Sequence, residues 1–137
     1  MVVLTLDGLR SYPKPAGAVG YGGKITMKGS RNGAYDVWMN KAISELYHLS
    51  DLPRELKIVG AVFTFHMADK RCGDVLNIAG SIMDALVKTK VLKDDCPEFV
   101  PLSSGRIIFN DSGKYSIVIT LCETIQDWNV ATFISQS

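Results

Sequence analysis

The stretch HMADKRCGDVLN, residues 66–77, could carry chemistry because three charged residues, Asp69, Lys70 and Arg71, precede the acid Asp74. A metal site built on paired carboxylates needs a second acid nearby, since Mg²⁺ prefers hard oxygen ligands. Two positions after Asp74 stands Leu76, whose side chain cannot ligate a metal. The stretch therefore fits three interpretations: the first half of a metal site, the remains of one, or an ordinary corner in which Asp74 caps a helix.

Two regular elements position this stretch. Apolar residues alternate from Glu55 to Met67, which predicts a long, mostly buried strand with His66 on its more polar face as a satisfied core-edge histidine. From Asp74 to about Lys88 the pattern has a helical period. The predicted polar arc consists of Asp74, Asn77, Ser81, Asp84 and Lys88, and the buried arc of Val75, Ile78, Ala79, Ile82, Met83 and Leu86.

The remaining elements predict a single α/β (α+β) domain over residues 1–137, in which a small mixed sheet packs with two main helices. We expect a short strand over Val2–Leu6 and an amphipathic helix over Gly33–Leu49 with Asn32 as its N-cap. An acidic loop holds Asp94 and Asp95. Strands 106–109 and 115–122 are expected to form a hairpin around the turn 110–113. Trp128 and Phe133 suggest that the tail 126–137 docks on a surface, either in its own subunit or across a dimer.

A basic loop over residues 8–35 contains no acid, although the whole chain has 15 basic and 14 acidic residues and a formal charge of +1. Its bases include Lys24, Lys28 and Arg31, with tyrosines between them. Such a loop suits phosphate contacts, and a plain solvated surface loop is the equal alternative. Bulk charge gives no hint of nucleic-acid binding, so any such signal is local.

The cysteines and the absence of long apolar runs indicate the cellular compartment of the protein. The three cysteines are widely spaced and form no CxxC pair, which argues against a disulfide framework or structural zinc and favours a reducing compartment. No stretch approaches the roughly 18 apolar residues of a membrane span. We therefore expect a cytoplasmic protein with no membrane partner.

The run HMADKRCGDVLNIAGSIMDALVKTKVLKDD resembles the core signature of the RusA family of Holliday-junction resolvases. In that family a strand ending in a basic cluster leads to D-x-D-N-x-x-K, then D-A-L, then an acidic pair. The matching positions are Asp74, Asn77, the triplet that begins at Asp84, and Asp94 with Asp95. The segments KITMKGSRNGAYDVWMNKAI and YSIVITLCE also resemble the family in order and length, so the likeness covers roughly residues 1–124.

The resemblance implies a homodimeric, Mg²⁺-dependent (or Mn²⁺-dependent) endodeoxyribonuclease that cuts branched DNA, and a phage-encoded member acting in the host cytoplasm. It implies catalytic roles for Asp74 and Asp95, and DNA contacts from Lys70 and Arg71 beside the acids. The implied metal ligands are Asp74, Asn77, Asp84, Asp94 and Asp95, which are expected to converge on one position.

The chain departs from the family pattern at two positions, where Leu76 replaces the second acid and Gly80 replaces the lysine. Because these positions are four residues apart on a helix, an acid and its basic neighbour are missing together. Two alternatives follow: a metal held by the remaining oxygen ligands, or a non-catalytic relative that binds DNA junctions or a protein. A third is an α/β protein with no such site, in which Asp74 is a helix cap and the acidic pair is a turn.

Overall fold

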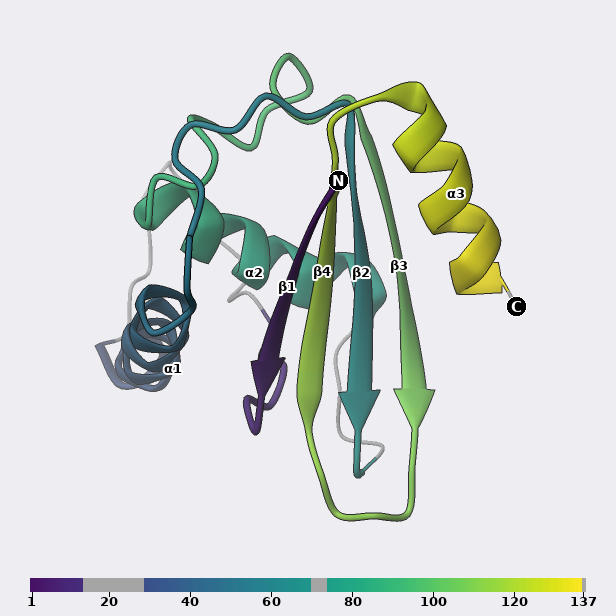
Figure 1. Cartoon of the computed structure of the whole chain (residues 1–137). Helices are drawn as coiled ribbons and strands as arrows, with labels where there is room; N and C mark the ends of the chain where they lie inside the picture. Colours follow the sequence, from purple (N-terminus) through teal and green to yellow (C-terminus); the bar gives the residue numbers. More distant parts are fainter. Residues whose placement is uncertain (14–28, 70–73, 137) are drawn as a thin grey trace, which may run out of the picture.

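The computed structural model describes residues 1–13, 29–69 and 74–136 and has the α+β architecture expected from the sequence, a four-stranded mixed sheet with helices (Figure 1). In chain order the elements are β1 (Val2–Asp7), α1 (Gly29–Tyr47), β2 (Gly60–Met67), α2 (Val75–Lys88), β3 (Leu102–Phe109), β4 (Ser116–Cys122) and α3 (Ile125–Gln136). Within the described ranges, no helix is both long and apolar enough to cross a membrane.

The strand order is β1-β4-β2-β3, so the predicted hairpin between the last two strands is wrong. β2 lies between β3 and β4, parallel to the first and antiparallel to the second. The connection after β3 therefore passes the end of β2, where the Asn110 amide donates to the Met67 carbonyl over 2.9 Å. β2 is mostly buried: one face is apolar, and the other is partly exposed only at Thr64 and His66. Such a strand is best accommodated in the middle of a sheet.

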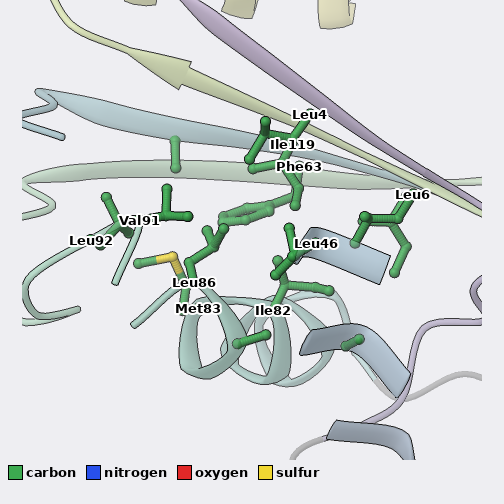
Figure 2. Packing of buried hydrophobic residues seen from close by; sticks show 14 of the residues in the cluster. Leu4, Leu6, Leu46, Phe63, Ile82, Met83, Leu86, Val91, Leu92 and Ile119 are labelled. Atoms are coloured by element: carbon green, nitrogen blue, oxygen red, sulfur yellow. The ribbon is translucent and has the colours of Figure 1, made fainter. Parts of the chain in front are cut away.

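The core lies between one face of the sheet and the pair α1 and α2 (Figure 2). Alternate strand residues such as Leu4, Phe63 and Ile119 point into it, as the period of two requires. Ile82 and Leu86 of α2 and Leu46 of α1 meet them from the helix side. β2 is shorter than the predicted strand from Glu55 to Met67, because the amides of Glu55 and Leu56 donate instead to the carbonyls of Lys90 and Val91 after α2. The packing confirms that the strand is mostly buried, and it confirms most of the predicted buried arc of α2.

Both helices differ from the sequence prediction in one detail. α1 already begins at Gly29, so Asn32 lies inside the helix and is not its N-cap. In α2, Ser81 belongs to the predicted polar arc but is buried, because its hydroxyl donates to the Tyr12 carbonyl over 2.5 Å. A small hydroxyl can face a packed segment when a backbone oxygen accepts its hydrogen bond.

The C-terminal segment forms α3 and packs on the sheet face opposite α1 and α2. Trp128 and Ala131 contact Val62 and Cys122 there, so Trp128 docks on its own sheet. A Cβ atom at Gly60 would come within 2.5 Å of Cε3 of Trp128, which explains why only glycine fits under the indole. Phe133, by contrast, is 75% exposed.

Candidate functional site

Asp74 caps the first turn of α2, as the sequence predicted. Its backbone is extended, and Oδ1 accepts a 2.9 Å hydrogen bond from the Asn77 amide. The start of α2 lies against β3, because a Cβ atom at Gly105 would be 2.9 Å from Cγ2 of Val75. The Asp74 side chain remains exposed and presents a carboxylate where the helix dipole favours negative charge.

Asp84 faces α1, about 15 Å along the axis from Asp74 at 1.5 Å per residue. Oδ2 of Asp84 accepts a 2.9 Å hydrogen bond from the phenol of Tyr35. Burial of the ring, followed by this hydrogen bond, raises the pKa of Tyr35 well above its ordinary value. The contact gives Asp84 a structural part in joining the two helices.

Asp94 and Asp95 follow the opposite end of α2. Oδ1 of Asp94 accepts from the Asp95 amide over 2.7 Å and from the Cys96 amide over 3.3 Å, which makes a local turn. The Leu92 amide donates to the Leu86 carbonyl over 3.2 Å and keeps this segment at the end of the helix. The chain then rises toward the start of β3 (Figure 1).

The expected convergence of these acids is therefore not found within one chain. α2 has 14 residues, which at 1.5 Å per residue separate Asp74 from the acidic pair by about 20 Å. Among the residues that the structure describes, no three His, Cys, Asp or Glu side chains lie close enough to hold a metal ion together. At the start of α2 the available oxygen ligands are those of Asp74 and Asn77, and their role as metal ligands remains a prediction.

Leu76 is 78% exposed, so the position of the missing acid faces solvent. A shallow depression beside it is lined by Val75, Ala79 and residues 103–105 of β3. A carboxylate at this position would therefore stay hydrated, two residues along the chain from Asp74. The structure leaves room for the acid that the sequence lacks.

The predicted DNA contacts fall largely outside the described residues. Lys24, Lys28, Lys70 and Arg71 lie in the segments 14–28 and 70–73, which the structure does not describe. Arg31 lies in α1, but its side chain is outside the description as well. These five residues remain predictions from the sequence.

A second polar group, missed in the sequence, lies where β1 and β2 end. Asp69 accepts a 2.7 Å hydrogen bond from the phenol of Tyr115, and Nη2 of Arg10 lies 3.2 Å from its Oδ1. The hydrogen bond that Tyr115 donates to Asp69, with burial as a smaller cause, raises the pKa of Tyr115. Next to this group, His66 and Lys114 line a cavity of about 730 Å³. Tyr115 and Arg10 are far apart in sequence, so only strand pairing reveals the group.

No family model matches the chain, and no curated protein matches it. The resemblance to the RusA family therefore rests on the residues and spacings of the sequence alone.

Proposed function

We propose that this protein is a RusA-type, Mg²⁺-dependent endodeoxyribonuclease that acts on branched DNA in recombination, repair or phage DNA processing. The observation that supports it best is the position of Asp74: an exposed carboxylate at the start of α2, the element that follows the central strand β2 in the chain. This is the order of elements that the resemblance requires.

The oxygen ligands at the start of α2 fit a weakly held, largely hydrated ion. Mg²⁺ keeps several waters and is commonly bound through one or two carboxylates, so Asp74 with Asn77 provides a minimal set. The bound ion would supply an activated water and stabilise the leaving oxygen of a phosphodiester. The part of Asp74 is to hold the ion, and its cap on the helix keeps the carboxylate oriented.

We assign five basic side chains to contacts with the phosphate backbone of DNA: Lys24, Lys28, Arg31, Lys70 and Arg71. Contacts of this kind give binding that depends weakly on sequence and steeply on salt. Replacing Lys70 and Arg71 with alanine should reduce the salt dependence of junction binding by about two phosphate contacts, a change of about 1.8 in the logarithmic slope. An unchanged slope would remove these two residues from the interface.

Resolution of a four-way junction requires two cuts related by a two-fold axis, so the proposal includes an isologous homodimer. Each subunit would then present one site to one strand.

Cleavage of a synthetic four-way junction in Mg²⁺ or Mn²⁺ tests the proposal. The wild-type chain should cut the junction and leave a linear duplex of the same sequence intact, and Asp74→Asn should lose the activity. Asp111→Asn, at an exposed acid in the turn after β3, is the matched control and should cut like the wild type. Cleavage that survives Asp74→Asn would contradict the assignment of the site.

A second candidate is a non-catalytic relative that binds junctions or a protein partner. The exposed apolar side chain of Leu76 and the separation of Asp74 from Asp94 and Asp95 favour it. This candidate predicts salt-sensitive junction binding without cleavage in either metal. The same assay therefore separates the two candidates, because both bind the junction and only one converts it to product.

A further inference from the structure

Arg106, on the edge strand β3, is a half-buried cation that no neighbouring side chain neutralises. Its Nε is buried, and among the described residues the guanidinium forms no hydrogen bond and no ion pair. A buried donor without an acceptor costs free energy, and the cost is larger for a charged group than for a neutral one. Arg106 is therefore suited to an acceptor of negative charge that binds from outside the chain.

This arginine lies at one end of a groove of about 250 Å³ on the sheet face that carries α3. In Figure 1 the strands are seen from this face, with α1 and α2 behind the sheet. Strand register places Arg106 beside Thr64 and Thr64 beside Val118, and the lining continues to Val3 on β1. The groove thus crosses all four strands, and at a strand spacing of about 4.8 Å its ends are about 14 Å apart.

Apart from Arg106, the side chains that line the groove are aliphatic, with two threonines. The aliphatic lining comes from the sheet, from α3 and from the N-terminus: Val3, Val62, Val118, Ala131, Ile134 and Met1. The Met1 ammonium does not act as a second cation, because it pairs with Glu123 at 3.0 Å and with Asp127 at 3.2 Å. Asp7, on the same sheet face, lines a different cavity. The groove therefore presents one positive charge at the end of an apolar surface.

We propose that this groove binds a single-chain aliphatic carboxylate, such as a medium-chain fatty acid, with the carboxylate on Arg106 and the tail directed toward Val3. The planar guanidinium matches a carboxylate in a bidentate pair. Glu123 and Asp127 lie at the Met1 end and disfavour a negative charge there, so charge complementarity sets the direction of the ligand. The methylenes of the tail are removed from water against the aliphatic lining, which favours binding in proportion to the buried area.

Other occupants fit the groove less well. A bound peptide needs partners for its own amides and carbonyls, but the backbone groups of β2 and β4 beneath the groove are already paired within the sheet. A nucleic acid needs several cations along its phosphates, and the described lining offers Arg106 alone. A single aliphatic chain with one charged end asks for neither.

Isothermal titration of the full chain with decanoate tests the inference without DNA. Decanoate should bind at one site with a Kd below about 100 µM, as expected for a ligand of this size in a groove that is only partly enclosed. Octanoate, which is two methylenes shorter, should bind about tenfold more weakly. Decyltrimethylammonium, with the same tail and the opposite charge, should not compete. Amide chemical shifts should change at Val62, Val118 and Thr120, which mark the floor of the groove.

Arg106→Gln should weaken decanoate binding at least tenfold, to the affinity of 1-decanol, because it removes the charge and keeps a side chain of similar size. The affinity for 1-decanol itself should not change in this variant. Val3→Glu, at the tail end of the groove where the side chain is 56% exposed, should weaken the binding of both ligands. Lys114→Gln is the matched control: it removes an exposed cation that lines the other cavity, and should bind decanoate like the wild type.

Three results would overturn the inference: a wild-type chain that does not bind decanoate at about 1 mM, equal binding of decanoate and decyltrimethylammonium, or decanoate binding that is as tight in Arg106→Gln as in Lys114→Gln. Chemical shift changes confined to residues outside the groove would do the same. Junction cleavage is a separate readout. Arg106→Gln should cut a four-way junction like the wild type, so the fatty-acid site and the nuclease can each fail without the other.

Discussion

The phenol of Tyr35 on α1 donates a 2.9 Å hydrogen bond to Oδ2 of Asp84 on α2. The ring of Tyr35 also stacks on Trp38, with centroids 6.1 Å apart. The family resemblance implies that Asp84 is a metal ligand. The hydrogen bond shows that Asp84 faces α1, so this carboxylate serves the packing of the two helices.

Tyr35→Phe should destabilise the protein by about 1 kcal/mol, because it removes one partly buried hydrogen bond to a carboxylate and keeps the aromatic packing. The free energy of unfolding in urea measures the effect. Tyr47→Phe is the control, since Tyr47 is 61% exposed, and should change stability by less than about 0.5 kcal/mol. Equal effects of the two variants would contradict the structural role of the contact.

Alkaline titration should reveal Tyr35 as a late-ionising phenol, because burial and the Asp84 carboxylate raise its pKa above 10.0. The neutral phenol is the form favoured by folding. The stability that it contributes is therefore complete below about pH 10, the unfolded value, and is lost as the pH rises through the higher folded pKa. Tyrosinate absorbance near 295 nm measures this, and Tyr35→Phe should remove the late component. Identical late components in both proteins would refute the assignment.

Asp74→Ala should destabilise α2 by about 1 kcal/mol, because the Asn77 amide loses its side-chain acceptor, whereas Asp74→Asn should cost a few tenths at most. Millimolar Mg²⁺ should raise the melting temperature of the wild type and of neither variant, as expected when only the carboxylate binds the ion. A Mg²⁺ shift that persists in Asp74→Asn would place the ion elsewhere.

Gly60→Ala should release Trp128 from the sheet, because the new methyl group would lie 2.5 Å from its ring. We expect a loss of about 1–3 kcal/mol, typical of overpacking, together with a red shift of tryptophan fluorescence as the indole becomes hydrated. Gly33→Ala is the control: it adds a methyl group where nothing lies within 4 Å, inside α1, and should stabilise the protein slightly. Unchanged fluorescence in Gly60→Ala would show that α3 packs in another way.

Leu76→Asp together with Gly80→Lys should create or strengthen binding of Mg²⁺ or Mn²⁺ beside Asp74. The exposed position of Leu76 allows the acid without loss of core packing, and the lysine four residues later forms a helical ion pair with it. Isothermal titration with each metal gives the affinity, with Leu76→Asn and Gly80→Lys as the uncharged control. A double variant that binds no more tightly than the control would exclude Asp74 and position 76 as a metal pair.

The sequence by itself determined the local features of the site. Period and capping chemistry placed the start of α2 at Asp74, and strict alternation placed Phe63 and Phe65 on the buried face of the central strand. Such signals depend on neighbours a few residues apart, so they can be read without knowing the fold.

Only the tertiary structure decided which distant segments meet. Strand pairing put β2 between β3 and β4 and so removed the expected hairpin, and the rigid length of α2 kept Asp74 away from Asp94 and Asp95. Their spacing along the chain suggested that these acids converge. Residues in a helix are separated by about 1.5 Å along its axis for each position, so acids at opposite ends of α2 lie far apart. The polar group of Arg10, Asp69 and Tyr115 likewise became visible only once strand pairing had brought distant segments together, because the partner of a strand is chosen by burial of the whole sheet and not by any local residue pattern.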